Sequence, residues 1–191
     1  MPTLSINDLR AGAKVEIDGG PYVIVSNEFV KPGKGQAFNR VRLKHLISGR
    51  TIDRTFKSGD KLEIAEVFET QMRMLYREID GAVFMDDNTF EQMKVSKEYL
   101  GDADRWLLED LLYEIVTYKG ELIAVTPPIF MEMVITQTDP AVRGDTASGR
   151  VMKPATTESG AMIQVPIFVD AGEKVKVDTR TGEYVSRVSE S

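Results

Sequence analysis

The chain has 191 residues, with 24 Lys and Arg against 30 Asp and Glu, one His, one Trp and no Cys. Since 42% of the residues are hydrophobic and 28% are charged, the composition is that of a folded protein and is too apolar for a disordered one. The lack of cysteine excludes disulfides and thiolate metal sites, and a single histidine excludes the usual histidine-rich zinc and iron sites.

The charge is spread unevenly along the chain. Residues 1–64 carry 11 basic and 7 acidic side chains, residues 65–127 carry 6 and 14, and residues 128–191 carry 7 and 9. This asymmetry predicts separate modules with separate partners. The densest basic stretch, residues 31–57, holds eight Lys and Arg against one Asp. It is either a phosphate-binding patch or the solvated face of a strand.

The first third predicts five short strands separated by turns, over residues 13–18, 22–30, 36–46, 51–57 and 61–67. The third of these alternates with a period of two, which predicts a half-buried strand. Its outer face carries the basic residues Arg40, Arg42 and Lys44, and its inner face carries Asn39, Val41, Leu43 and His45. We expect His45 to be a core or rim histidine and not a catalytic one. Five strands in about 65 residues predict a small barrel.

The middle third predicts further strands over residues 72–79, 82–85, 90–95, 114–118 and 121–126. It also predicts a helix over Asp104–Leu112, because Trp106, Leu107 and Leu111 recur at helical spacing. Pro127 and Pro128 then break the chain.

The last third predicts strands over residues 129–136, 161–169, 174–178 and 183–188, with polar loops over 139–153 and 170–173. Short strands with few helices fit oligonucleotide-binding (OB) barrels. No apolar run is longer than four residues, whereas a membrane span needs about 20, so we expect a cytoplasmic protein with no membrane partner.

The loop Lys31-Pro32-Gly33-Lys34-Gly35 is an unusual local feature. Pro32 stiffens one limb, and the two glycines free the backbone on both sides of Lys34. The spacing predicts a hairpin tip that projects one ammonium group, which can enter a narrow space or be held by a modifying enzyme. An ordinary glycine turn with an exposed lysine is the alternative that spacing alone leaves open.

The chain resembles the bacterial translation elongation factor P family over nearly its whole length. Motifs similar to the family's occur in the family's order: NDLRAG at 7–12, KPGKGQAF at 31–38, FKSGD at 56–60, VTPP at 125–128, TDPAVRGDTASG at 138–149, KPATTESGAMIQVPIFV at 153–169 and VDTRTGEYVSR at 177–187. The resemblance implies an all-β fold of three small barrels in an L shape. These would be a KOW-type (SH3-like) barrel over residues 1–64 and OB barrels over 65–128 and 129–191.

The resemblance also implies a function. The family binds the bacterial ribosome between the P and E sites, stimulates peptide bond formation, and relieves stalling at consecutive prolines by positioning P-site peptidyl-tRNA. It implies a monomeric, non-enzymatic factor without a cofactor or metal. Lys34 would be the tip residue, covalently extended by lysine-modifying enzymes, with β-lysylation expected. Gly144, Asp145 and Thr146 would form the loop that contacts the E-site mRNA codon, although Asp145 could instead only cap its own loop.

The basic residues predict contacts with RNA, and two other functions are open to this sequence. The backbone phosphates of RNA would be contacted by Lys31, Arg40, Arg42 and Lys44. A generic OB-fold protein that binds single-stranded nucleic acid is one rival, but it favours exposed aromatic residues on the barrel faces. An enzyme using Glu109 and Asp110 is the other, but neighbours on a helix point about 100° apart and do not converge on one substrate.

Overall fold

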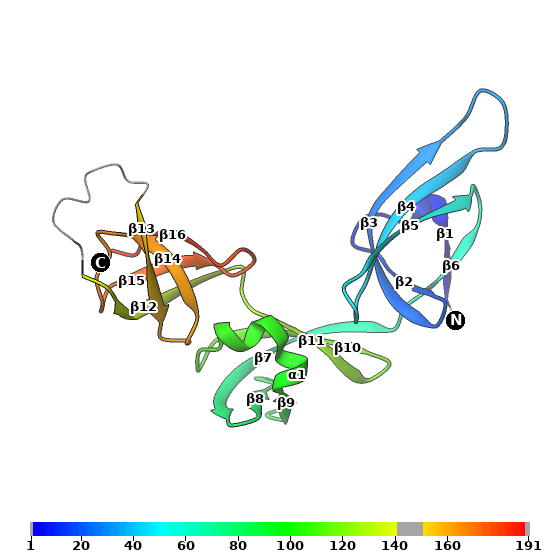
Figure 1. Ribbon diagram of the computed structural model, residues 1–191. Coiled ribbons are helices and arrows are strands. Elements are labelled where there is room, and N and C mark those ends of the chain that lie inside the picture. The colour runs from blue at the N-terminus through cyan, green and yellow to red at the C-terminus, as the bar shows by residue number, and fades with distance from the viewer. Residues whose placement is uncertain (1, 141–150, 190–191) are drawn as a thin grey trace. The chain divides into compact units, whose positions relative to one another are not determined.

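The computed structural model describes residues 2–140 and 151–189, which form three antiparallel sheets (Figure 1). The expected all-β architecture is therefore confirmed. Among the described residues no helix is long and apolar enough to cross a membrane.

The first sheet has the strand order β1-β6-β2-β3-β4-β5. Its strands are β1 Thr3–Ser5, β2 Lys14–Ile17, β3 Gly20–Val30, β4 Phe38–His45, β5 Thr51–Lys57 and β6 Lys61–Ile64. Its core consists of buried aliphatic residues, namely Ile6, Leu9, Val15, Ile17, Ile24, Val41 and Leu43. The alternation predicted for β4 is confirmed, because Asn39, Val41 and Leu43 are buried and the intervening basic residues are exposed. Strand β1 was not predicted, since three residues are too few to show a period.

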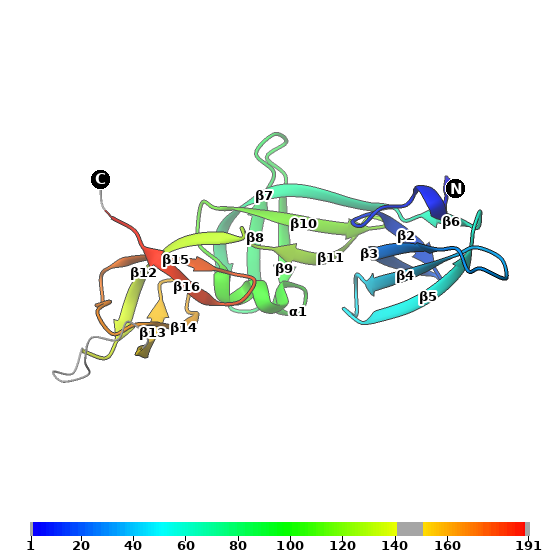
Figure 2. The ribbon, with the colours of Figure 1, turned by 90° about the horizontal axis from the view of Figure 1, so that it is seen from above.

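The second sheet has the order β11-β10-β7-β8-β9. Its strands are β7 Val67–Glu78, β8 Gly81–Met85, β9 Gln92–Ser96, β10 Leu112–Tyr118 and β11 Glu121–Thr126. The turn that connects β8 to β9 projects beyond the rest of this sheet (Figure 2).

The helix predicted over residues 104–112 is wrong. The chain instead forms the short helix α1 Lys97–Leu100 and the 3-10 turn η2 Gly101–Trp106, and then becomes extended at Leu107. The Tyr113 hydroxyl donates to the carbonyl of Trp106 at 2.6 Å and accepts from the backbone N–H of Leu108 at 2.8 Å. This side chain therefore satisfies backbone groups that a continuing helix would have paired.

The third sheet has the order β14-β13-β12-β15-β16. Its strands are β12 Phe130–Thr138, β13 Met152–Thr157, β14 Met162–Pro166, β15 Lys174–Asp178 and β16 Glu183–Arg187. Strand β13 lies partly in a predicted loop and was missed. It contains Pro154, whose carbonyl accepts from the Thr138 hydroxyl at 2.9 Å, one position before the ladder with β12 begins at Ala155.

Trp106 belongs to the core of the third sheet although it precedes that sheet by more than 20 residues. It is fully buried with Met131, Met133, Val175 and other aliphatic residues of that core. Trp106 belongs to this core and Leu111 packs against it, which explains the spacing of these two residues without a helical backbone.

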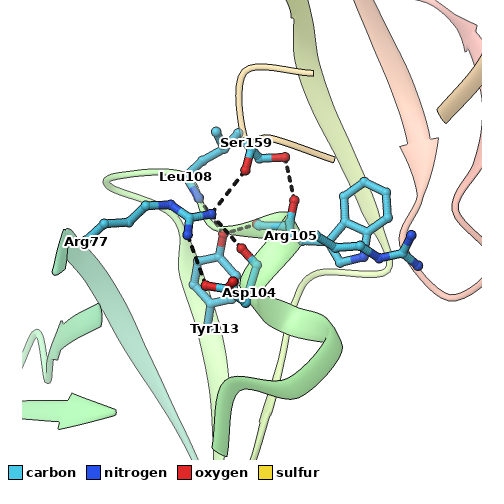
Figure 3. Close-up of polar contacts among 7 residues, drawn as sticks. Arg77, Asp104, Arg105, Leu108, Tyr113 and Ser159 are labelled. Atoms are coloured by element: carbon cyan, nitrogen blue, oxygen red, sulfur yellow. Dashed lines mark hydrogen bonds and ion pairs between the residues drawn. The ribbon is translucent and has the colours of Figure 1, made fainter. Parts of the chain in front are cut away.

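Polar contacts reinforce this joint between the second and third sheets (Figure 3). The Arg77 guanidinium on β7 pairs with the Asp104 carboxylate at 3.0 Å and donates to the carbonyls of Asp104 and of Ser159, the latter at 3.1 Å. The Ser159 hydroxyl donates to the Arg105 carbonyl at 2.7 Å. Strand β7, the η2 turn and the turn between β13 and β14 therefore share one hydrogen-bonded network.

The described chain divides into two compact units. One contains residues 1–69 and 116–124, and the other contains residues 70–115 and 125–191. Strands β7, β10 and β11 contribute residues to both units. The predicted module boundaries at 64 and 128 and the L-shaped arrangement remain predictions.

Candidate functional site

The loop at residues 31–37 forms the tip of the β3–β4 hairpin, which extends beyond the other strands of the first sheet (Figure 1). The two strands pair as far as Val30 and Phe38. Lys31, Gly33, Lys34 and Gly35 are exposed, and Pro32 is half-buried. The tip therefore presents Lys34 to solvent, as the sequence predicted.

The two tip glycines differ in what they contribute. Gly35 has a φ of +117°, a conformation that L side chains rarely adopt, so the turn requires glycine there. Gly33 has ordinary backbone, and a Cβ at that position would have no described atom within 4 Å. The space beside Lys34 is thus open, and only one glycine is needed for the turn itself.

A pair of asparagines, Asn39 buried and Asn27 half-buried, fixes the hairpin to the start of the chain. The Asn27 amide donates to the carbonyls of Ile6 and Leu9, both at 2.8 Å. The Asn39 amide in turn donates to the Asn27 side-chain oxygen at 2.9 Å, and Asn39 is only 3% exposed. These bonds make the base of the hairpin rigid. The alternation of β4 places Asn39 on the inner face but does not reveal this role, for which a polar residue on an apolar face is the signal in the sequence.

The basic face of β4 is exposed, but it is less positive than the sequence predicted. Arg42 forms an ion pair with Asp53 on β5, with Nε and Oδ1 3.0 Å apart. This hydrogen bond and the accompanying charge attraction raise the pKa of Arg42, and the same hydrogen bond lowers the pKa of Asp53. Arg40 lies opposite Glu28 in the β3–β4 register. Neither Arg40 nor Lys44 has an ion pair with a described residue.

His45 lies at the end of β4 and is partly buried. Its Nδ1 accepts from the backbone N–H groups of Ile47 and Ser48, and its ring packs edge-on against Tyr22 at 4.8 Å. His45 therefore stabilises the turn after β4, as expected for a rim histidine.

The other candidate residues are distributed elsewhere. Gly144, Asp145 and Thr146 lie outside the described residues. Glu109 and Asp110 are exposed and follow η2 in non-helical backbone, so the 100° separation expected of helical neighbours does not describe them. Within residues 2–140 and 151–189, no three His, Asp or Glu side chains are grouped so that they could hold a metal ion.

Family models cover most of the chain. The model described as the elongation factor P KOW-like domain matches residues 5–62, the elongation factor P OB domain matches 67–125, and the elongation factor P C-terminal model matches 131–187. The chain belongs to the elongation factor P family. It is therefore a ribosome-associated translation elongation factor, and its fold class is confirmed as a KOW-type barrel followed by OB-type β domains.

Curated relatives of the family match the chain along its length. "Elongation factor P 2" of Protochlamydia amoebophila is 64% identical over 189 residues, which is 99% of this chain and all of the relative. "Elongation factor P 2" of Chlamydia trachomatis serovar D is 59% identical over the same coverage. Such identity over nearly the whole chain supports the same family membership for all three modules.

Solved structures give a weaker likeness. The structure titled "Eukaryotic translation initiation factor 5A from Methanococcus jannaschii" has a TM-score of 0.55 and 23% identity, and it covers 66% of this chain and 92% of that chain. At this identity the likeness concerns the fold alone.

Proposed function

We propose that this factor binds the bacterial ribosome between the P and E sites and relieves stalling at consecutive prolines by positioning peptidyl-tRNA with Lys34. The observation that carries the proposal is the tip of the β3–β4 hairpin, where an exposed lysine with open space beside it stands on a base fixed by Asn27 and Asn39. A rigid base and an unobstructed cation are what a positioning device needs.

Positioning the peptidyl-tRNA can by itself accelerate peptide bond formation. Proline is a poor nucleophile in peptide transfer because its ring restricts approach. Holding the reacting ends in an attack-ready geometry supplies much of the barrier reduction through entropy, without acid or base chemistry. A tip loop (residues 31–37) that holds two lysines and no carboxylate or histidine fits that role.

The exposed face of β4 would contact the RNA backbone. Arg40, Lys44 and Lys31 are exposed cations without an ion pair to a described residue, and phosphate contacts by such side chains orient a protein on RNA without reading sequence. Arg42 would have to share its guanidinium with Asp53.

A covalent extension of Lys34, most simply β-lysylation by lysine-modifying enzymes, would lengthen the tip. An unmodified lysine reaches only about 6 Å from its Cα. The open space at Gly33 leaves room for a modifying enzyme to approach. An added amine would also keep positive charge close to phosphates.

Membership of the elongation factor P family supports a further role at the E site. The loop containing Gly144, Asp145 and Thr146 would contact the E-site mRNA codon, and the factor would act as a cytoplasmic monomer. Gly144 would let the backbone approach RNA closely, and the Asp145 carboxylate would accept hydrogen bonds from base amino groups.

Translation of a reporter with three consecutive prolines tests the proposal. We expect Lys34→Ala to melt like the wild type, because surface substitutions change stability by less than about 0.5 kcal/mol, and to abolish rescue of the stalled reporter. Lys61→Ala, at an exposed lysine of β6, is the matched control and should rescue normally. Protein from the native host, with Lys34 extended as seen by peptide mass, should rescue better than unmodified protein. Full rescue by Lys34→Ala would disprove the role of the tip.

A further inference from the structure

The turn between β8 and β9 presents an aromatic side chain in a conformation unsuited to it. Phe90 has a φ of +61°, and among the four non-glycine residues described with positive φ it is the only apolar one. The left-handed region suits glycine and asparagine and is unfavourable for a bulky side chain. Phe90 is also 70% exposed.

The rest of the turn holds Phe90 firmly in this position. The Asp86 carboxylate accepts from the backbone N–H groups of Asn88 and Thr89, at 2.7 and 3.1 Å. The Phe90 N–H donates to the Asp86 carbonyl at 2.8 Å. Asp87 is anchored to Arg73 on β7 by two hydrogen bonds, at 3.0 and 2.7 Å. The aromatic ring is therefore carried by a braced turn.

Neither the backbone nor the core accounts for phenylalanine at this position. The backbone conformation favours glycine, and a ring that is 70% exposed adds little to the core. A strained side chain that buries little in the free protein is typical of functional sites such as ligand and partner contacts. Rigid aromatic residues are typical anchors of protein interfaces.

The charge around the turn selects the class of partner. Residues 86–91 include Asp86, Asp87 and Glu91 and no basic side chain, within a segment (residues 65–127) that carries 14 acidic and 6 basic side chains. Asp87 is paired with Arg73, whereas Glu91 is exposed and has no ion pair with a described residue. Such a surface repels the RNA backbone and attracts a basic protein surface.

We propose that the β8–β9 turn is a protein-docking site, in which Phe90 inserts into an apolar pocket of a ribosomal protein and Glu91 faces basic side chains at the rim of that pocket. This inference rests on the proposed ribosome binding. The proposed function places no ribosome contact at the β8–β9 turn, and the inference adds a contact with protein there.

The first experiment separates stability from binding. Phe90→Gly should raise the melting temperature by about 2–4 °C, because the unfavourable φ is relieved in a chain of this size. The same variant should bind bacterial ribosomes about tenfold more weakly in sedimentation. Ile79→Ser, in the turn between β7 and β8 and 95% exposed in the wild type, is the matched control and should bind normally. If wild-type protein binds and Phe90→Gly binds equally well, this proposal fails while the proposed function stands. If wild-type protein does not bind, both fail.

The second experiment identifies the class of partner by the sign of an effect. Glu91→Lys should weaken ribosome binding if the partner surface is basic protein, and should strengthen it if the partner is RNA. A photo-crosslinking phenylalanine analogue at position 90, in full-length factor on ribosomes, should give an adduct with a ribosomal protein. A crosslink to ribosomal RNA, or tighter binding by Glu91→Lys, would overturn the proposal.

Discussion

Asn27 and Asn39 hold the β3–β4 hairpin by side-chain bonds to backbone carbonyls and to each other. Asparagine suits this role because one amide both donates and accepts, so Asn27 can bond Ile6 and Leu9 while receiving a bond from Asn39. The precision of the tip therefore depends on residues that lie outside the tip loop itself.

We expect Asn39→Ala to lower the free energy of unfolding by about 1 kcal/mol, because the half-buried Asn27 side-chain oxygen loses its donor. Urea unfolding measures this. Gln36→Ala, at an exposed position of the tip loop, should leave stability unchanged. An Asn39→Ala midpoint equal to that of the wild type would show that the asparagine pair does not stabilise the hairpin.

At the scale of elements, strand β4 shows what a sequence pattern can predict and the segment after α1 shows what it cannot. In β4 a period of two agrees with a sheet whose one face is buried, so the alternation and the exposed basic face could be predicted. Trp106, Leu107 and Leu111 have helical spacing, but Trp106 is buried in the core of the third sheet. Periodicity reports burial within one element and does not reveal burial against a distant strand.

The candidate site shows the same limit. The exposed lysine at the tip was predictable because glycine and proline act locally. The pairing of Arg42 with Asp53 was not, because it depends on the register between β4 and β5. Phe90 was placed in a strand because a backbone conformation cannot be inferred from an aromatic residue that normally favours extended structure.

The Tyr113 hydroxyl offers a test at this scale. Burial raises the pKa of Tyr113 to about 12, so its ordinary value of 10.0 applies only to the unfolded chain. The stabilising contribution of the neutral hydroxyl is therefore complete below pH 10 and is lost as the pH rises through about 12.

We expect Tyr113→Phe to lower the free energy of unfolding at pH 7 by about 1–3 kcal/mol, since the Leu108 N–H loses its acceptor. The difference between wild type and variant should narrow between pH 10 and 12. Chemical unfolding across that range measures it, and Tyr184→Phe, at a partly buried tyrosine of the third sheet, is the comparison. A constant difference up to pH 12 would contradict this account.

At the scale of the whole molecule, the larger compact unit contains two sheets joined by Arg77, Ser159 and the buried Trp106. Arg77 donates to carbonyls on both sides of the joint. A guanidinium suits this position because its several donors lie in one fixed plane.

We expect Arg77→Ala to leave each sheet folded but to loosen the joint. Amide hydrogen exchange at residues 157–161 should become about 5–30 times faster, corresponding to a loss of one or two kcal/mol. Arg73→Ala is the matched control, because Arg73 lies on the same strand and pairs with Asp87 of the second sheet. Equal exchange in the two variants would show that Arg77 does not hold the joint.

The burial of Trp106 also gives the molecule an intrinsic optical reporter. It is the only tryptophan in the sequence, it is fully buried, and the Arg105 guanidinium lies 4.6 Å from the centre of its ring. Its fluorescence should be blue-shifted in the native factor and should shift to the red only when the core of the third sheet opens to water. Tryptophan emission can therefore follow that one core in an unlabelled factor, because the first barrel and its tip hold no tryptophan.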